Sequence, residues 1–263
     1  MKDIQNMRDP RNIKIDKVGV KNITYPIVVL DKENGYQHTI ATIDMYVSLS
    51  QENKATHMSR FVEILHKNQS MINMKNFPKI LKEMLELLDA ESAHLDIRFP
   101  YFVKKEAPVT KKPSYMEYQC GVCGSMDSPG EMKEFKVYVS VPINTLCPCS
   151  KEISAYGAHN QRGIVKVCVK FKKFFWIEDL IDIVEDSAST EIYSLLKRED
   201  EKFITERAYE NPKFVEDVVR DIAERLSKDE NIKWFSIEAE NFESIHNHSA
   251  YAYLEIENKG GQL

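Results

Sequence analysis

Apolar and polar residues alternate along several separate stretches of the chain. From Ala41 to Leu49 every odd-numbered residue is apolar, whereas Thr42, Asp44 and Ser48 are polar. A period of two is typical of a strand that buries one face. The pattern predicts strands at about 17–25, 41–49, 92–104, 114–124, 135–141, 165–171, 234–241 and 249–257.

Between these strands, apolar residues recur at intervals of three and four, which is the spacing of an amphipathic helix. Two proline positions support helix starts: Pro78 suits a first turn, and Asn211-Pro212 combines a capping residue with a proline. The spacing predicts helices at about 58–65, 77–88, 192–196 and 215–226.

In chain order the elements read strand, strand, helix, helix, strand, strand, and this series occurs twice. The two halves meet near Pro129-Gly130, which predicts a tail at 1–12, a first module at 13–129 and a second module at 130–263. Strands outside and helices inside each half predict an α+β fold in which helices cover one face of an antiparallel sheet.

Length and charge narrow the class of protein. The 263 residues, 43% of them hydrophobic, are enough to bury a sizeable core, and the net charge of −5 argues against a general nucleic-acid binder. No apolar run reaches the length of a membrane span, and the polar start MKDIQNMRDPRNIKID does not resemble a secretory signal. We therefore expect a cytoplasmic protein with no membrane partner.

Five cysteines in such a chain point to metal binding or catalysis rather than to a disulfide framework. Cys120 and Cys123 stand at opposite parity in an extended segment, so we expect them on opposite sheet faces and structural. Cys168 is expected within a strand. The C-x2-C and C-x-C pairs superficially resemble a zinc ribbon, but the second spacing does not fit one.

The stretch NTLCPCSKEISAYGAHNQRG, residues 144–163, concentrates residues that can carry chemistry. Pro148 places Cys147 near a helix N-cap, where free backbone N–H groups stabilise a thiolate that binds metal or attacks carbon. A small apolar residue at a strand end explains that cysteine equally well. A continuous helix would hold His159 about 18 Å from Cys147, so a shared site requires a break, which Gly157 offers.

Three other polar stretches are candidates, each with a simpler explanation. Glu243, His246 and His248 suit a metal site or proton transfer, but also a solvated hairpin turn. Glu216 falls on the flank of an apolar helical stripe, where solvated carboxylates are common. Residues 56–60 could hold an anion at a helix start with help from Arg60, or simply cap that helix.

Four motifs in order along the chain resemble the type IB GTP cyclohydrolase I family. They are THMSRF (56–61), LCPCSKEIS with GAHNQR (146–162), ERAYENPKFVED (206–217) and NFESIHNHSAYA (241–252). The resemblance implies the tunnelling fold (T-fold), with tandem β-β-α-α-β-β modules and a homotetramer whose active sites lie at subunit boundaries. It implies that the substrate is GTP, which is converted to 7,8-dihydroneopterin triphosphate and formate.

The resemblance also implies a divalent metal, because hydration of guanine C8 at neutral pH needs an activated water. Cys147 and His159 would be ligands, with Glu201 and His246 completing the set; Zn²⁺ suits these donors, and Mn²⁺ or Fe²⁺ can replace it. His246 and His248 would transfer protons.

Substrate contacts follow from the same resemblance. Glu216 would accept hydrogen bonds from the guanine amino and ring N–H groups, with Glu243 as its competitor. The anionic triphosphate needs cations, for which the sequence offers Arg60, Lys151, Arg162 and Arg198.

Two rival functions remain at this stage. Cys147 would serve a nitrile-reducing T-fold relative, in which the cysteine attacks a nitrile and NADPH supplies hydride without metal. A non-catalytic zinc-stabilised binding module would use Cys120, Cys123, Cys147 and Cys149.

Overall fold

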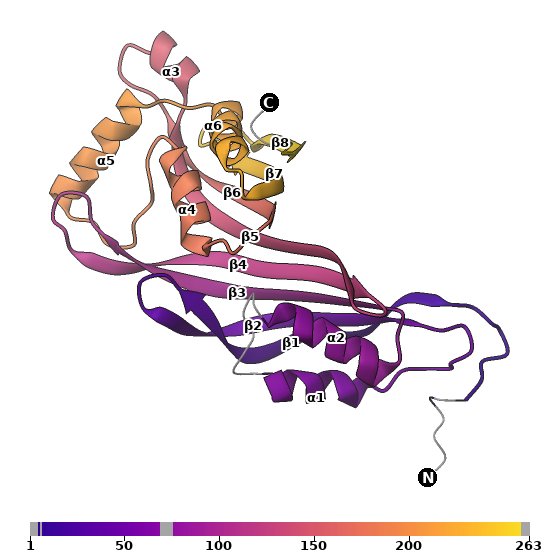
Figure 1. Ribbon diagram of the computed structural model, residues 1–263. Helices are drawn as coiled ribbons and strands as arrows, with labels where there is room; N and C mark the ends of the chain where they lie inside the picture. The colour runs from indigo at the N-terminus through magenta and orange to yellow at the C-terminus, as the bar shows by residue number, and fades with distance from the viewer. Residues whose placement is uncertain (1–4, 6, 69–75, 259–263) are drawn as a thin grey trace. The chain divides into compact units, whose positions relative to one another are not determined.

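The structure, a computed structural model, describes residues 5, 7–68 and 76–258 (Figure 1). Its strands form one eight-stranded sheet whose order follows the chain from β1 to β8. The strands are β1 (Ile15–Asp31), β2 (Gly35–Leu49), β3 (Ser92–Glu106), β4 (Pro113–Asp127), β5 (Glu131–Leu146), β6 (Asn160–Phe171), β7 (Ile232–Asn241) and β8 (Ala250–Glu257). The helices are α1 (Met58–Asn68), α2 (Phe77–Leu88), α3 (Pro148–Ile153), α4 (Ile177–Asp186), α5 (Arg198–Glu210) and α6 (Val215–Lys228). The predicted α+β class and all eight strands are therefore confirmed.

The chain forms two compact units that share three long strands. One unit comprises residues up to Pro100 together with 121–136, and the other comprises 101–120 and the residues from Val137 onward. The division passes through β3, β4 and β5, so each unit contains segments from both sides of the Pro129-Gly130 turn.

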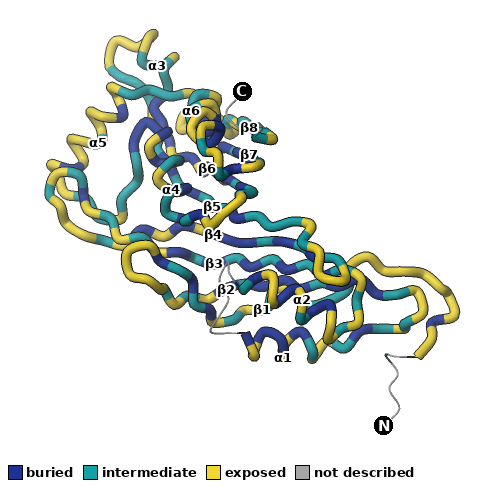
Figure 2. Tube along the Cα trace, viewed as in Figure 1, coloured by how far each residue is buried: buried dark blue, intermediate teal, exposed yellow. Residues whose placement is uncertain are grey.

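In the first unit, α1 and α2 lie on one face of the sheet (Figure 1). Each helix buries apolar side chains toward the sheet, although Met58 and Val62 of α1 remain 43% and 47% exposed, and β2 carries buried, dark blue stretches in Figure 2. Phe61, Leu65, Ile80 and Met84 are fully buried, as are alternate residues of β2 such as Ile43. Burying each such side chain contributes about 1.5–3 kcal/mol, so the period-two and period-3.6 patterns together account for this core.

In the second unit, α6 packs on β7 and β8, and α4 lies against α6. The stripe of α6 is buried through Val218, Ile222 and Leu226, and it faces strands whose alternate residues, such as Val167 and Ile237, have no exposed surface. The antiparallel pairing of β5 with β6 runs without a bulge from Val137↔Val169 to Leu146↔Asn160.

The predicted helix at 192–196 is wrong. Residues 187–197 form turns and a short bridge, because Thr190 pairs with Asn144 at the end of β5. Two helices flank this segment instead, α4 and α5, and neither was predicted. Asn211 is not the N-cap of α6 either: it caps the C-terminus of α5, and α6 begins at Val215 behind Phe214.

The predicted tail at 1–12 has contacts in its described part. Arg8 forms a bridge with Asn53, and the Asp9 N–H donates to the Glu52 carbonyl at 3.1 Å. Asp9 also pairs with Arg11 at 2.6 Å. Within the described ranges, no helix is long and apolar enough to span a membrane.

Asp200 anchors the β3–β4 turn to the start of α5. Its carboxylate accepts the N–H groups of Val109, Thr110 and Lys197 and the Thr110 hydroxyl, at 2.7–2.9 Å. Burial opposes ionisation of Asp200, but these hydrogen bonds, led by those from Thr110, outweigh it and hold the pKa well below its ordinary value.

We expect Asp200→Asn to lower the unfolding temperature, because one amide oxygen cannot accept all four hydrogen bonds. A carboxyl with a depressed folded-state pKa stabilises the fold above its unfolded pKa, about 4, and this contribution is lost as the pH falls below that value. The difference in unfolding temperature between wild type and variant, followed by circular dichroism, should therefore be largest near neutral pH and shrink below about pH 4. Glu199→Gln, at an exposed neighbouring position, is the control. A difference of constant size across this pH range would contradict the assignment.

Candidate active site at the ends of β5, β6 and β7

Cys147 and His159 are cross-strand neighbours. The last pair of the β5–β6 ladder is Leu146↔Asn160, and the Cys147 N–H donates to the His159 carbonyl at 3.1 Å, which extends the register by one step. Residues that oppose each other in an antiparallel pair have side chains on the same face, with Cβ atoms about 4.5–5.5 Å apart. The register therefore places a thiol and an imidazole side by side.

The connection between the two residues is a short helix followed by a tight turn. Cys147 is the N-cap of α3 and Pro148 its first residue, as predicted, and the Cys147 Sγ accepts the Ser150 N–H at 3.4 Å. The helix ends at Ile153, and Gly157 has a φ of +125°, a conformation that side chains disfavour. The predicted break at Gly157 is thus confirmed, and it returns the chain to His159.

Ser150 closes this connection. Its hydroxyl donates to the Cys147 carbonyl at 3.1 Å and accepts the His159 N–H at 3.2 Å. One side chain thereby ties the backbones of both candidate ligands together.

A second row of polar residues lies one step further into the sheet. Thr145 opposes Gln161 in the β5–β6 pair. On the other side of β6, Gly163 opposes Asn241 and the Phe242 N–H donates to the Arg162 carbonyl at 2.9 Å, so the continued register places Glu243 opposite Gln161. These residues share the parity of the buried positions of β5 and β6, and Thr145 and Gln161 are themselves buried.

This row is joined by hydrogen bonds. The Gln161 amide nitrogen lies 3.2 Å from Thr145 Oγ1 and 3.3 Å from Glu243 Oε1. The Gln161 oxygen lies 2.9 Å from His159 Nδ1, which also has Ser244 Oγ at 3.4 Å and Glu243 Oε2 at 3.9 Å. The side chains of His159 and Glu243 are each 13% exposed, so the imidazole stands at the edge of the core with a carboxylate beside it.

Gly163 allows β6 and β7 to approach at the base of this row. A Cβ at this position would lie 2.4 Å from Asn241 Oδ1 and 2.9 Å from the Glu240 carbonyl. Only glycine fits there without displacing the neighbouring strand.

The segments that precede and follow α5 hold the end of β5 in place through hydrogen bonds. The Leu146 N–H donates to Ser189 Oγ at 3.1 Å, and its carbonyl accepts the Lys213 N–H at 3.0 Å. Asn211, at the end of α5, donates to the carbonyls of Ala188 and Ser189. The polar segment that contains ERAYENPKFVED thus supports the backbone beneath Cys147.

The other predicted site residues of this unit are mostly exposed. His246 and His248 lie in the turn between β7 and β8, with stacked rings 5.1 Å apart. Glu216 is exposed in the first turn of α6, and Glu201 and Arg198 are exposed in the first turn of α5.

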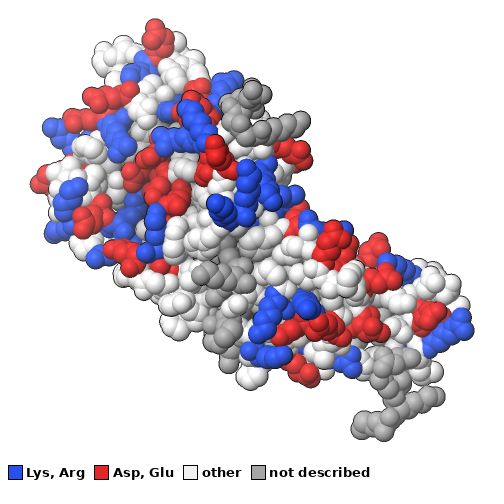
Figure 3. All heavy atoms as spheres, in the orientation of Figure 1, with Lys and Arg blue, Asp and Glu red and all other residues white. Residues whose placement is uncertain are grey.

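The predicted cations have different environments. Lys151 donates to the Tyr209 carbonyl at 2.5 Å and lies 4.4 Å from the centre of the Tyr209 ring, so α3 contacts the end of α5. Arg162 is exposed on β6. Arg60 lies on α1 in the first unit, where its guanidinium donates to the Leu87 carbonyl at 2.8 Å. On the face drawn in Figure 3, basic and acidic side chains are interspersed, so the choice among these cations rests on individual contacts.

The donor chemistry of the Cys147 and His159 pair fits a divalent cation of intermediate softness. Within the described residues, no three His, Cys, Asp or Glu side chains gather as a metal cage. The structure therefore brings together two of the four predicted ligands, Cys147 and His159, and does not bring Glu201 or His246 into one group with them. The four cysteines of the zinc-module alternative form no such group among the described residues either, and Cys120 is buried within β4.

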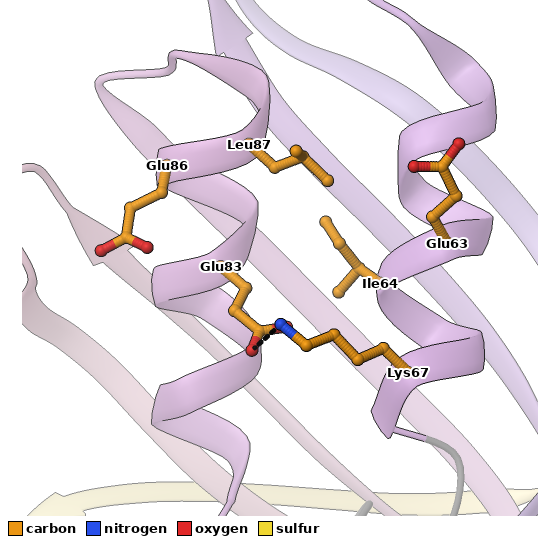
Figure 4. Close-up of a pocket in the computed structure, with 6 residues that line it drawn as sticks. All are labelled: Glu63, Ile64, Lys67, Glu83, Glu86 and Leu87. Atoms are coloured by element: carbon orange, nitrogen blue, oxygen red, sulfur yellow. Dashed lines mark hydrogen bonds and ion pairs between the residues drawn. The ribbon is translucent and has the colours of Figure 1, made fainter.

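Two cavities lie away from this site. One, of about 360 Å³, lies between α1 and α2, where Lys67 reaches Glu83 at 3.1 Å (Figure 4). The described residues that line it include no cysteine, no histidine and no predicted site residue.

The other cavity, of about 490 Å³, is lined by β3, β4 and α4. Here Lys105 pairs with Glu185 at 2.8 Å and Glu191 at 2.7 Å, and the Tyr118 hydroxyl donates to Glu185 at 2.7 Å. Burial raises the pKa of Glu185, although Lys105 and Tyr118 favour its charged form. Because these groups satisfy one another, we interpret the cluster as structural.

Sequence reasoning missed Gln161 and Thr145. A signal was present: Gln161 has the same parity as Val165, Val167 and Val169, the buried face of its strand. A glutamine in such a position needs internal hydrogen-bond partners.

Comparison with known proteins identifies the family. A family model described as "Type I GTP cyclohydrolase folE2" matches residues 1–252. The chain belongs to this family.

Among curated relatives, the chain is 60% identical over 255 residues to "GTP cyclohydrolase FolE2" of Syntrophobacter fumaroxidans, covering 97% of this chain and 99% of that protein. It is 59% identical to the protein of the same name from Syntrophus aciditrophicus, over 98% of this chain and all of that protein. Among solved structures, a uricase from Bacillus fastidious is similar in fold, with a TM-score of 0.60 at 7% identity and 94% of each chain covered. A urate oxidase from Bacillus sp. TB-90 aligns with a TM-score of 0.57 at 7% identity, over 92% of this chain and all of that chain.

Ser150→Ala should loosen the connection between the two candidate ligands. Loss of hydrogen bonds worth about 1–1.5 kcal/mol should speed hydrogen exchange at the His159 amide about five- to tenfold. Ser154→Ala is the matched control, because the Ser154 hydroxyl accepts the Tyr156 N–H at 3.2 Å within the exposed turn, away from the His159 amide. Equal exchange at His159 in both variants, measured by mass spectrometry of peptides spanning 155–162, would show that Ser150 does not close the site.

Proposed function

We propose that this protein is a GTP cyclohydrolase I of type IB, which opens the imidazole ring of the guanine of GTP and yields 7,8-dihydroneopterin triphosphate and formate. The observation that carries this proposal is the family match over nearly the whole chain, which includes both members of the Cys147–His159 pair. The curated relatives named GTP cyclohydrolase FolE2 align with this chain over almost their full lengths.

The reaction needs water to attack guanine C8, after which the ring opens and C8 leaves as formate. A bound divalent cation, Zn²⁺ or Mn²⁺ or Fe²⁺, supplies a Lewis acid that makes water nucleophilic near neutral pH. Cys147 and His159 hold this cation, and Glu201 and His246 are the candidates for the remaining ligands. The paired register of the first two supports the proposal, because it presents a thiol and an imidazole on one face.

Other residues orient the substrate and move protons. Glu216 accepts hydrogen bonds from the guanine amino and ring N–H groups, and its exposure leaves the carboxylate available. His246 and His248 exchange protons with the opening ring and the ribose. Glu243, the competitor for guanine recognition, contacts Gln161 and His159, which favours a role near the cation over one in base recognition.

The triphosphate is bound by lysine and arginine side chains. Arg162 and Arg198 are exposed, whereas Lys151 and Arg60 each donate to a backbone carbonyl. We therefore rank Arg162 and Arg198 above Lys151 and Arg60 as phosphate ligands.

The fold is a T-fold with tandem β-β-α-α-β-β modules, and the protein assembles as a homotetramer with active sites at subunit boundaries. The element order supports the tandem repeat, with α3 and α5 as additions in the second half. Exposure of Glu201, His246 and Glu216 in a single chain is consistent with a site that a second copy completes.

Cys147→Ala should abolish formate release while leaving the fold intact. Loss of a ligand sulfur should lower kcat/KM by at least about 100-fold, a larger effect than the loss of a residue that only orients a ligand. Metal-free protein, incubated with GTP and then with zinc, manganese or iron, should regain pterin fluorescence and formate release only when the sulfur is present. Cys149→Ala, two positions away at an exposed site, is the matched control and should retain activity. Full activity of chelated wild type, or of Cys147→Ala, would refute the proposal.

Glu216→Gln should remove recognition of the guanine edge. A hydrogen bond to a charged group contributes about 1.5–3 kcal/mol, so kcat/KM for GTP should fall about 10- to 100-fold. Inosine triphosphate lacks the exocyclic amino group, so the preference of wild type for GTP over this analogue should largely disappear in the variant. Glu224→Gln, exposed on the same helix, is the control. If the variant still prefers GTP over inosine triphosphate as strongly as wild type does, Glu216 does not anchor the guanine and another residue must.

A further inference from the structure

Gln161 is a buried amide between the imidazole of His159 and the carboxylate of Glu243. The residue is 6% exposed, and its side chain makes three polar contacts. No step of the proposed reaction yet uses it.

The neighbours of Gln161 determine the orientation of its side-chain amide, that is, the positions of its oxygen and its nitrogen. An ionised carboxylate only accepts hydrogen bonds, so the group 3.3 Å from Glu243 Oε1 must be the donating NH₂. The amide oxygen is then the group 2.9 Å from His159 Nδ1. Because an amide oxygen cannot donate, Nδ1 must carry the proton in this contact.

The other atoms near Nδ1 agree with this assignment. Ser244 Oγ at 3.4 Å can accept a hydrogen bond, and Glu243 Oε2 at 3.9 Å is a carboxylate oxygen. In a neutral imidazole with its proton on Nδ1, the lone pair is on Nε2, and that atom is the one free to bind a metal.

The backbone of His159 is already fixed by Cys147 and Ser150. The remaining freedom is the rotation of the ring and the choice of tautomer, and the Gln161 oxygen constrains both. Thr145, fully buried on β5, holds the amide from its other end at 3.2 Å.

We propose that Gln161 is a positioning residue that fixes the ring orientation and the Nδ1–H tautomer of His159 and so presents Nε2 to the divalent cation. The tautomer assignment rests on the contacts of this chain, whereas the ligand role rests on the proposed function. Both can be tested separately.

The first test uses metal-free wild-type protein labelled with ¹⁵N-histidine. Solid-state ¹⁵N spectra at alkaline pH, with the His159 signal assigned by its loss in His159→Gln, should show the proton on Nδ1. Gln161→Met, which matches the side-chain length but lacks polar atoms, should shift the population toward Nε2–H. A wild-type signal with the proton on Nε2, or an unchanged tautomer in Gln161→Met, overturns the proposal.

The second test is a titration of the same metal-free proteins with Co²⁺, read through the sulfur-to-cobalt charge-transfer band of Cys147. Gln161→Met should weaken Co²⁺ binding about 10- to 100-fold. Ser244→Ala, which removes only the hydroxyl 3.4 Å from Nδ1 and leaves Gln161 in place, should bind close to the wild-type value. Circular dichroism should confirm that each variant is folded.

The two tests separate the failures. If Gln161→Met binds Co²⁺ as tightly as wild type, the positioning role is overturned even if the proposed activity stands. If wild type gives no sulfur-to-cobalt band although His159 carries the Nδ1 proton, the ligand role and the proposed function fall, and the control of the tautomer by Gln161 is supported.

Discussion

The antiparallel register of β5, β6 and β7 is the constraint on which the candidate site depends. The ladder between β5 and β6 runs from the apolar centre to Leu146↔Asn160 without a bulge, and β7 pairs with β6 in step as far as Gly163↔Asn241. The hydrogen bonds that continue both ladders place Cys147 opposite His159 and Glu243 opposite Gln161. The period of two that places apolar side chains in the core therefore also places these polar side chains together on one face of the sheet.

The site occupies the place where the buried face of the sheet changes from apolar to polar. Ile143 and Val165 are completely buried, and Thr145 and Gln161 follow them on the same face with almost no exposed surface. A buried polar group without a partner costs about 1–3 kcal/mol, so this arrangement is stable only because the side chains bond to one another. The same bonds orient the imidazole, which joins the stability of this edge of the sheet to its chemical role.

The sequence predicted those parts of the fold that depend on local periodicity. All eight strands and the helices α1, α2 and α6 follow patterns that neighbouring residues determine. The segment around Ile192 was assigned wrongly because its backbone bonds to Asn144, distant in sequence, and α5 was missed because its largely exposed surface has little apolar pattern. The position of Cys147 at an N-cap and the break at Gly157 were predicted because proline and glycine have strong local preferences. The contact between Gln161 and Glu243 joins residues that are 82 positions apart, and no local pattern reveals it.

The unbroken ladder also determines where this protein can accept changes in chain length. An extra residue in the exposed turn at 154–156 lies outside the paired strands, so every side chain of β5 and β6 stays on its own face of the sheet. An extra residue between Gln161 and Val165 would turn the imidazole of His159 and the amide of Gln161 to the opposite side of the sheet, away from their partners on the neighbouring strands, while each strand could still pair. Insertions at the tip of the β5–β6 connection are therefore compatible with this site. Insertions within β6, a few residues later in the chain, are not.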